Sequence, residues 1–357
     1  MDDLPLSAAS GELLTRRARE GALYTPQSDN KVRCTACAHL CIIPEGHSGI
    51  CRVRFNRQGI LYSPDGYVAG LQCDPIEKKP FFHVHPGCNT LSFGMLGCNY
   101  HCDFCQNWET SQSYREPDAP TIPVTAVRPE QIIRFAAESD ARVIVSTYNE
   151  PLITSEWAAR VFDEAHAAGF KTAFVSNGYA SRDALEYLRP RLDLFKVDLK
   201  SFSDPFYRKL GGNLQKVLDA ITSIHALGYW MEIVTLVIPG LNDSENDLRE
   251  MARFIVSVSP DIPWHVTAFH KDYKMHSPPD ATAAHLIRAA EIGQREGLRY
   301  VYAGNQPGQV GPFENTRCAK CRQTLVERYG FFVRKNLLKD SFGQCPHCKT
   351  LIPGFWG

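Results

Sequence analysis

The strongest constraint on the fold is a long stretch in which short apolar runs alternate with amphipathic segments. Seven runs rich in β-branched and aromatic residues are predicted strands, over residues 90–95, 142–148, 171–177, 192–199, 231–238, 265–269 and 299–303. Six segments carry apolar residues at helical intervals, over residues 129–138, 155–168, 181–188, 214–227, 244–258 and 282–296. This alternation predicts an α/β fold whose parallel sheet is closed or nearly closed into a barrel, with the chemistry at the carboxyl ends of the strands.

Length and charge limit the class of protein. The 357 residues suffice for about two domains, or for one barrel with appendages. The 39 Lys and Arg residues balance the 39 Asp and Glu residues, so the formal net charge is zero. A neutral chain without a dense basic run lacks the electrostatic footprint of a protein that binds nucleic acid through its whole surface, so nucleic acid is not an expected partner.

Two segments bear on the location of the chain. The N-terminal residues open acidic and hold no continuous apolar region, so they do not resemble a signal peptide. The most apolar stretch, residues 230–241, is shorter than the roughly 20 residues that span a bilayer, and it contains Glu232 and Pro239. We therefore expect a cytoplasmic chain without a membrane partner, whose 13 cysteines serve metal sites in place of disulfides.

Most of the cysteines fall into three groups around the cysteine-free stretch. The groups are Cys34, Cys37, Cys41 and Cys51; Cys98, Cys102 and Cys105; and Cys318, Cys321, Cys345 and Cys348. Cys73 and Cys88 stand alone and are expected to be buried or unassigned thiols. His83 and His85 would share one face of a strand, where we expect surface or substrate-cleft histidines in preference to metal ligands.

The middle group follows the first predicted strand on a tight loop with the spacing C-x3-C-x2-C. A structural zinc site or an ordinary four-cysteine cluster needs four protein ligands, and no fourth cysteine is near in sequence. Three thiolates on a 4Fe-4S cluster would leave one iron open for a substrate or cofactor. The alternative is a zinc site completed by His101 or by a distant residue.

This motif, with Phe104 before its last cysteine, resembles the radical S-adenosylmethionine (SAM) superfamily. The resemblance implies a partial (β/α)6 TIM-like barrel in which Cys98, Cys102 and Cys105 hold a 4Fe-4S cluster. In that superfamily the open iron binds SAM, and reduction of the cluster cleaves SAM to methionine and a 5′-deoxyadenosyl radical that takes a hydrogen atom from the substrate. An electron donor such as flavodoxin or ferredoxin is implied as a partner, and Phe104 is implied as a SAM contact.

The second and third predicted strands end in residues similar to the SAM site of the superfamily. Tyr148, Asn149 and Glu150 resemble the acidic motif that holds the SAM amino group, although Tyr148 and Asn149 replace its two usual glycines. A carboxylate and an ammonium form a charge-assisted pair, so Glu150 is the expected contact, with Asn149 beside it. The alternative for Glu150 is an acid favoured by a helix dipole. Asn177 is expected on the SAM ribose or carboxylate, or as a helix N-cap.

The later strands add charged candidates. Lys196, Asp198 and Lys200 share one face of a strand that is expected to be buried, where charges need partners or a ligand. A similar D-x-K pattern contributes to the SAM site of glycyl-radical activating enzymes, which implies Asp198 and Lys200 as SAM contacts; the alternative is an internal ion pair. His270 and Tyr273 are candidates for the substrate side, with a plain polar loop residue as the alternative for His270.

A narrower resemblance, over residues 20–357, is to the AmmeMemoRadiSam-system radical SAM enzymes, relatives of the pyruvate formate-lyase activating enzyme. It is carried by residues 34–54, 74–80, 97–108, 148–151, 198–201 and 302–305 and by the C-terminal cysteines. The resemblance implies a Memo-like protein as a candidate partner and leaves the substrate open between a glycyl-radical protein, another protein and a small molecule. From another class, the chain would be a zinc-bearing module that binds protein or nucleic acid, with the barrel as scaffold.

The flanking cysteines predict further metal sites. Two C-x2-C pairs, Cys318 with Cys321 and Cys345 with Cys348, have the spacing of a zinc ribbon, in which zinc would supply folding energy. We expect a structural docking module there, with nucleic-acid or protein binding as the alternative. The N-terminal four cysteines are expected to hold zinc or a second iron–sulfur cluster. The predicted domains are a cysteine-rich extension (1–89), the barrel (90–312) and a zinc-ribbon-like module (313–357).

Overall fold

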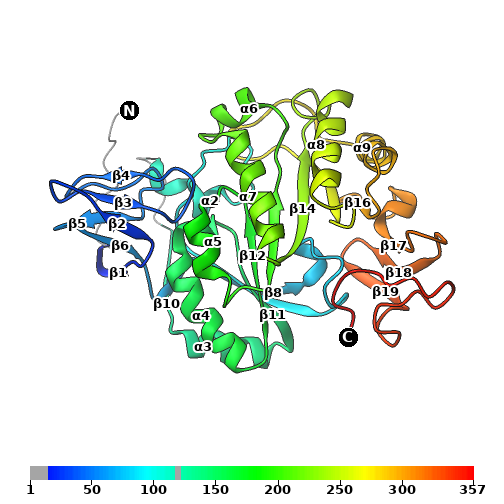
Figure 1. Cartoon of the computed structure of the whole chain (residues 1–357), viewed down its shortest axis with the longest axis horizontal. Helices are drawn as coiled ribbons and strands as arrows, with labels where there is room; N and C mark the ends of the chain where they lie inside the picture. The colour runs from blue at the N-terminus through cyan, green and yellow to red at the C-terminus, as the bar shows by residue number, and fades with distance from the viewer. Residues whose placement is uncertain (1–14, 117–121) are drawn as a thin grey trace.

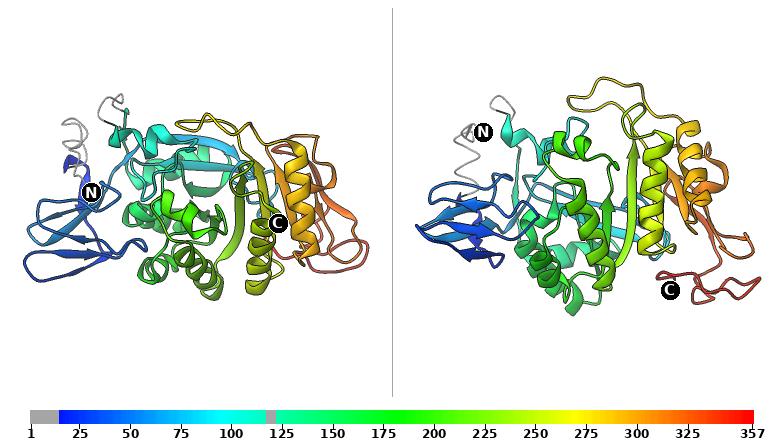
Figure 2. Two further views of the ribbon diagram at one scale, coloured as in Figure 1. Left: turned by 90° about the horizontal axis from the view of Figure 1, so that it is seen from above. Right: turned by 45° about the horizontal axis from the view of Figure 1, so that its top comes forward.

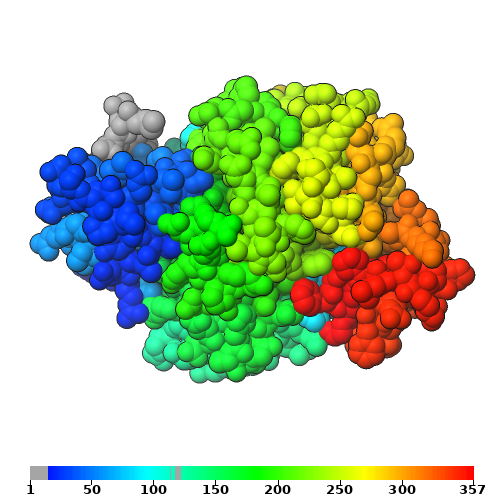
Figure 3. All heavy atoms as spheres, viewed as in Figure 1, coloured from blue at the N-terminus to red at the C-terminus, as the bar shows by residue number. Residues whose placement is uncertain are grey.

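A central body of one sheet and its covering helices lies between two smaller β regions (Figure 1). The computed structural model describes residues 15–116 and 122–357. Most of the N-terminal segment in which the sequence predicts no signal peptide therefore lies outside the described residues. The N-terminal region and the C-terminal module lie at opposite ends of the long axis, and both touch the central body (Figure 3).

The central sheet has eight strands in the order β16-β15-β14-β13-β12-β11-β9-β8. Seven run parallel, and β8 joins β9 in the antiparallel sense. Their bounds are β8 (Gly70–Pro75), β9 (Asn89–Gly94), β11 (Ala141–Ser146), β12 (Lys171–Ser176), β13 (Leu194–Asp198), β14 (Trp230–Val237), β15 (Trp264–Ala268) and β16 (Val301–Gly304). Within the described residues β8 and β16 are unpaired edges, so the barrel is partial.

All seven predicted strands are present, with ends within two residues of the prediction. Parallel strands covered on both faces are almost continuously apolar, which is why the sequence shows them clearly; Val143, Ile144 and Val145 of β11 are fully buried. The eighth strand, β8, was not predicted because its sequence GLQCDP shows neither alternation nor β-branched residues. Pairing with β9 from Gly70 to Pro75 holds it, so the predicted extension contributes one strand to the barrel sheet.

Helices cover the outer face of the sheet (Figures 1 and 2). The main ones are α3 (Pro129–Glu138), α4 (Ser155–Ala167), α5 (Arg182–Leu188), α7 (Leu214–Ala226), α8 (Glu245–Val258) and α9 (Ala283–Arg295). Shorter turns are α2 (Trp108–Ser111), α6 (Asp204–Lys209), η1 (Ile76–Lys78), η2 (Ser113–Arg115), η3 (Pro151–Thr154) and η4 (Gly311–Glu314). Ser181, Asn213 and Ser244 begin α5, α7 and α8 as N-caps. No helix in the described ranges is long and apolar enough to cross a membrane.

A chain of aromatic rings packs α4 against the sheet. Phe162 of α4 lies 6.3 Å from Phe93 of β9 and 5.7 Å from Phe174 of β12, measured between ring centroids. Phe174 in turn lies 5.8 Å from Phe195 of β13. All four side chains are fully buried. Ring contacts of this kind stabilise beyond their buried area, so they fix the outer layer against the strands whose ends form the site.

The N-terminal region consists of small sheets. One contains β1 (Ala18–Glu20), β6 (Ile60–Pro64) and β5 (Phe55–Arg57); another contains β2 (Tyr24–Pro26), β3 (Val32–Cys34) and β4 (Ile42–Ile43); and β7 (Tyr67–Val68) pairs with β10 (Thr125–Ala126). A buried ion pair joins this region to α4, because Arg54 Nη1 and Nη2 donate to the Glu156 carboxylate at 2.6 and 2.7 Å. Burial alone would raise the pKa of Glu156, but Arg54 lowers it overall.

The C-terminal module is a small sheet of β17 (Thr316–Arg317), β18 (Thr324–Tyr329) and β19 (Phe332–Asn336). Arg328 joins it to the body: its guanidinium donates to Glu77 at 3.3 Å, to the Phe82 carbonyl at 2.8 Å and to Thr316 Oγ1 at 2.9 Å. The side chains of Arg328 and Glu77 are both completely buried.

The position of His83 corrects the sequence prediction. Expected at the surface or in a cleft, it is fully buried between the body and the C-terminal module, because its ring nitrogens bond to Tyr302 Oη at 2.6 Å and to the Pro353 carbonyl at 2.7 Å. Its segment is not a strand, and His85, with a φ of +40°, does not share a face with it. Burial lowers the pKa of His83 to about 4, so the ring is neutral and structural.

Removing one partner of the buried Arg328–Glu77 pair is expected to destabilise the chain strongly. The substitution Arg328→Met keeps an unbranched, though shorter, side chain and leaves the Glu77 carboxylate without its cation, a change that typically costs about 3–5 kcal/mol. The matched control is Arg182→Ala, whose pair with Glu186 is more than half exposed and is worth at most about 0.5 kcal/mol. Urea unfolding measures both; equal stability of the two variants would contradict the prediction.

Candidate active site

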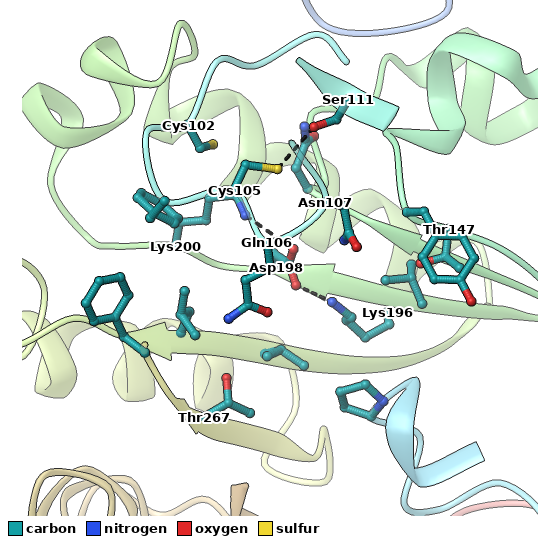
Figure 4. A pocket seen from close by; sticks show the side chains of 18 of the residues that line it. Cys102, Cys105, Gln106, Asn107, Ser111, Thr147, Lys196, Asp198, Lys200 and Thr267 are labelled. Atoms are coloured by element: carbon teal, nitrogen blue, oxygen red, sulfur yellow. Dashed lines mark hydrogen bonds and ion pairs between the residues drawn. The ribbon is translucent and has the colours of Figure 1, made fainter. Parts of the chain in front are cut away.

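A cavity of about 610 Å³ lies at the carboxyl ends of the parallel strands, beside the loop that follows β9 (Figure 4). The predicted site residues that line it are Cys98, Cys102, Phe104, Cys105, Asn149, Glu150, Asn177, Asp198, Lys200 and His270. Side chains predicted from separate strand ends therefore surround one space. Among the site candidates of the barrel, Tyr273 lies outside this lining.

Gly97 begins the cysteine loop with a backbone that a larger residue would strain. Its φ is +103°, and an added Cβ would lie 2.7 Å from Val53 Cγ1. The Gly97 N–H donates to the Thr110 carbonyl, and the His101 N–H donates to the Leu210 carbonyl. Backbone contacts therefore set the shape of the loop and leave its thiols available as ligands.

The thiols have neighbours that suit thiolates. Cys98 Sγ accepts the Tyr100 N–H at 3.4 Å, and Cys105 Sγ lies 3.1 Å from Ser111 Oγ (Figure 4). Burial raises the pKa of Cys102 to about 12, while the nearby Lys200 ammonium acts in the opposite direction. Hydrogen-bond donors and a cation near sulfur stabilise the deprotonated, metal-binding form.

The spacing of the three thiols fits a cluster better than a single ion. One zinc with Zn–S bonds of about 2.3 Å would hold its sulfurs about 3.8 Å apart. Within residues 15–116 and 122–357, the three loop sulfurs do not all lie within 4.8 Å of one another. Thiolates of a 4Fe-4S cluster bind different iron atoms and stand farther apart. Asn99 Nδ2 on the same loop is buried without a partner among these residues, and a cluster sulfur would accept its hydrogen bond.

The position of His101 argues against one form of the zinc alternative. His101, offered as its completing residue, is exposed and does not line the cavity. Its ring packs over Gly211, where an added Cβ would lie 2.6 Å from Cε1.

Glu150 is held by a dense set of donors at the end of β11. Its carboxylate accepts hydrogen bonds from Leu152 N at 3.1 Å, Ser176 Oγ at 2.7 Å and Asn177 N at 2.7 Å. Because it accepts the Leu152 N–H, Glu150 is the N-cap of η3, as the alternative of an acid at a helix N-terminus predicts. The same carboxylate also lines the cavity. Burial raises the pKa of Glu150 to about 7, against the effect of these donors.

Tyr148 takes the backbone form that the two usual glycines of this motif would favour. Its φ of +69° lies in the left-handed region, which costs a non-glycine residue roughly 1–2 kcal/mol. Its ring covers Gly94, where an added Cβ would lie 2.9 Å from Tyr148 Cβ, and its hydroxyl accepts a hydrogen bond from Lys79 at 3.3 Å. The replacement of glycine therefore adds a strained aromatic side chain to the wall of the cavity.

Asn177 is a turn residue and not the predicted N-cap. The N-cap of α5 is Ser181, whereas Asn177 Oδ1 accepts the Tyr179 N–H at 3.0 Å. Asn177 Nδ2 donates to Asn99 Oδ1 at 2.7 Å, which joins the end of β12 to the cysteine loop. Asn149 has a similar bracing contact, because its Oδ1 accepts the Met95 N–H at 3.0 Å.

Lys196 and Asp198 of β13, and Lys200 two residues after the strand, line the cavity, as the alternation predicts. The Asp198 carboxylate pairs with Lys196 and, at 3.3 Å, with Lys200 (Figure 4). Burial alone would raise the pKa of Asp198, but the two ammonium groups lower it overall. The internal ion pair offered as an alternative therefore exists, and it faces the same space as the thiols.

The two substrate-side candidates differ in position. His270 is exposed at the rim of the cavity, with its Nε2 3.0 Å from Gln106 Nε2. Tyr273 stacks on Trp108 at 5.3 Å between ring centroids, and its hydroxyl donates to Glu116 at 2.7 Å. Only His270 is placed to meet a molecule in the cavity.

Comparison with known proteins identifies the domain. The model of the radical SAM superfamily matches residues 94–255, which include the cysteine loop, Glu150 and the Asp198–Lys200 pair. An uncharacterized protein of Methanocaldococcus jannaschii is 37% identical over 337 residues, 94% of this chain and 98% of that protein. The chain belongs to the radical SAM superfamily.

Two further relatives are named as activating enzymes, and one similar structure is that of a methyltransferase. A pyruvate formate-lyase-activating enzyme of Clostridium pasteurianum is 23% identical over 54% of this chain and 81% of its own length. An isethionate sulfite-lyase activating enzyme of Oleidesulfovibrio alaskensis is 28% identical over 38% of this chain and 46% of its own length. A radical SAM methyltransferase structure from Sphaerobacter thermophilus aligns over 90% of this chain and 86% of its own, with 16% identity and a TM-score of 0.47, too low to add to the assignment.

Membership of the radical SAM superfamily makes the chain an enzyme. The alternative of a binding module with the barrel as scaffold therefore does not describe the whole protein.

Outside the cavity, the four C-terminal cysteines form a compact group. Their sulfurs all lie within 4.8 Å of one another, with Cys318 3.5 Å from Cys348 and Cys321 3.6 Å from Cys345.

Two residues behind the cysteine loop were not predicted. The Tyr114 hydroxyl donates to the Cys51 carbonyl at 2.9 Å and accepts the Cys98 N–H at 3.1 Å. Arg115 Nη2 donates to the carbonyls of Ile50 at 3.0 Å and Cys98 at 2.5 Å. No spacing signal marks these residues, because their partners come from distant segments.

Proposed function

We propose that this chain binds SAM beside a 4Fe-4S cluster held by Cys98, Cys102 and Cys105, and that it cleaves SAM reductively. When bound, the cluster supplies the electron that splits SAM into methionine and a 5′-deoxyadenosyl radical, which abstracts hydrogen from a substrate. The carrying observation is the number and place of the thiols: three, on the wall of the cavity that Glu150 and Asp198 also line. Three thiolates leave one iron of a cluster without a protein ligand.

The other lining residues have distinct tasks in this proposal. The Glu150 carboxylate accepts a hydrogen bond from the SAM ammonium, a charge-assisted contact in a buried setting. Lys200, held by Asp198 and lying 6.0 Å from the centre of the Phe104 ring, is placed for the SAM carboxylate. Asn177, between the cysteine loop and β12, is placed for a ribose or carboxylate oxygen.

The proposal requires a one-electron donor, for which flavodoxin or ferredoxin is the expected class. A Memo-like partner and a cytoplasmic location stay predictions from the sequence, as do the three domain boundaries. We also propose that Cys318, Cys321, Cys345 and Cys348 hold structural zinc, since sulfur separations of 3.5 and 3.6 Å match the edges of a ZnS4 tetrahedron. Each pair forms the same turn, with a positive φ at Arg322 and Lys349 directly after its second cysteine.

Activation of a glycyl-radical protein is the second candidate, favoured by the two activating enzymes among the relatives. Hydrogen abstraction from a backbone glycine would leave a stable radical on the partner. Electron paramagnetic resonance (EPR) of the reduced enzyme with SAM and a candidate partner would show a glycyl doublet in this case. Modification of a small molecule or of another protein residue would leave no such doublet.

The SAM site is tested by EPR of the reduced cluster with and without SAM. Because the open iron is the expected binding point, SAM should change the g-values of the signal. The Cys73→Ala protein is the matched control, since this thiol is exposed and outside the cavity, and it should show the same change. A signal from the loop cluster that is identical with and without saturating SAM would contradict the proposal.

A further inference from the structure

The N-terminal cysteines form a second group of thiols outside the cavity. Cys34, Cys37 and Cys51 are buried and Cys41 is half-buried; Cys34 ends β3, and the other three lie in the irregular segments on either side of β4. The Cys34 N–H donates to the Cys41 carbonyl at 2.9 Å, which brings the two ends of the loop together. The thiols of Cys34, Cys41 and Cys51 all lie near enough to that of Cys37 to interact with it electrostatically.

This group differs in two ways from the compact C-terminal four. First, no three of its sulfurs lie within 4.8 Å of one another, judged over the described residues. Second, the C-terminal pairs each form a knuckle in which the first cysteine accepts the N–H of the residue four positions later, as in Arg322 to Cys318 and Lys349 to Cys345. The spacing C-x2-C-x3-C-x9-C provides no second pair, and Cys34 is instead part of a strand.

We propose that Cys34, Cys37, Cys41 and Cys51 hold a second iron–sulfur cluster in place of zinc. A single zinc would draw four sulfurs to about 3.8 Å from one another, as the C-terminal four show, whereas a four-cysteine 4Fe-4S cluster gives each thiolate its own iron and needs a wider arrangement. With four thiolates this cluster has no open iron. Its task is therefore to carry an electron, not to bind SAM.

The position of the group supports that task. One hydroxyl, of Tyr114, contacts both the Cys51 carbonyl and the Cys98 N–H, and Arg115 bridges the same two loops. On the other side, His39 Nε2, between Cys37 and Cys41, lies 3.0 Å from the Asn99 carbonyl. The N-terminal group is therefore in direct contact with the catalytic cysteine loop on two sides.

The relay role rests on the proposed function, whereas the presence of the second cluster does not. A ferredoxin- or flavodoxin-class donor would lose one electron to the N-terminal cluster, which would pass that electron to the loop cluster and return to its oxidised state. No proton or other group is transferred in this step.

The decisive protein is the triple variant Cys98→Ala, Cys102→Ala, Cys105→Ala, reconstituted anaerobically with iron and sulfide. It leaves the N-terminal thiols intact, so the test does not depend on the folding of an altered N-terminal region. We expect it to keep about four iron and four sulfide per chain, half of the wild-type content. After dithionite it should show an EPR signal that SAM does not change. Zinc without iron at this site, with the C-terminal zinc counted separately, would overturn the proposal.

The reciprocal variant is the double substitution Cys37→Ser, Cys41→Ser, which leaves two thiolates, one fewer than the cysteine loop uses, with Cys73→Ser as its matched control. We expect the double variant to lose about half of the wild-type iron and to retain only the signal that changes with SAM. Full iron in the double variant would overturn the proposal. Failure of the proposed function would give a different result. The EPR signal of the loop cluster would not change on addition of SAM, while the iron content of the triple variant would still be about half that of the wild type.

Discussion

The Cys102→Ala protein is expected to form no measurable 5′-deoxyadenosine from SAM. Cys102 is buried on the cavity wall, and without its thiolate the loop offers two ligands to a cluster that needs three. We expect activity to fall by more than the roughly 100-fold that is typical when a group supporting a metal ligand is lost. Chromatography of the acid-quenched reaction, with dithionite as reductant, measures the loss.

Cys73→Ala is the control for this substitution, because it removes a thiol that is exposed and remote from the cavity lining. Its activity should equal that of the wild type. The unfolding midpoint of Cys102→Ala shows whether the barrel itself persists. Near-wild-type 5′-deoxyadenosine formation by a folded Cys102→Ala protein would contradict the assignment of the loop cysteines.

Replacing Glu150 by glutamine is expected to weaken SAM binding by about 10- to 150-fold. The substitution keeps the size of the side chain but removes the charge that pairs with the SAM ammonium, and hydrogen bonds to charged groups contribute about 1.5–3 kcal/mol. Calorimetric titration of the reconstituted protein with SAM measures the change. Glu109→Gln is a control, since this acidic residue does not line the cavity. If Glu150→Gln bound SAM with unchanged affinity, the proposed contact between Glu150 and the SAM ammonium would be contradicted.

The same carboxyl predicts a pH dependence. The pKa of Glu150 is raised to about 7, so lowering the pH through this value protonates the carboxylate before SAM binds. Wild-type affinity for SAM should therefore fall as the pH is lowered from about 7 to about 5.5, a range in which the α-amino group of SAM stays largely protonated. Affinity of the Glu150→Gln protein should be much less sensitive over this interval. Equal slopes for the two proteins would contradict the role of the carboxylate.

The strands and helices of the barrel could be predicted because each shows its own pattern within a few consecutive residues. A buried parallel strand is a continuous apolar run, and its helices carry their own periodicity, so β9 and β11 to β16 appeared within two residues of their ends. The strands of the N-terminal region, such as β4 (Ile42–Ile43), are too short to show a periodic pattern in the sequence. Their order comes from tertiary contacts such as the Arg54–Glu156 pair, which joins residues 102 positions apart.

The same distinction applies to the site. Glu150, Asp198 and Lys200 stand at strand ends, and the topology of a parallel barrel brings such ends together. Tyr148 could not be interpreted from sequence, because nothing local marks its left-handed backbone or its contact with Lys79, a residue 69 positions away. The burial of His83 depends in the same way on the C-terminal module that packs over it.

The most direct test of the central claim is the product of SAM cleavage. The wild-type protein, reconstituted anaerobically until its iron content is complete, is mixed with SAM and dithionite, and 5′-deoxyadenosine and methionine are quantified over time. The account predicts that both accumulate in equal amounts, and only when reductant is present. Absence of 5′-deoxyadenosine from a protein with full iron loading would contradict it.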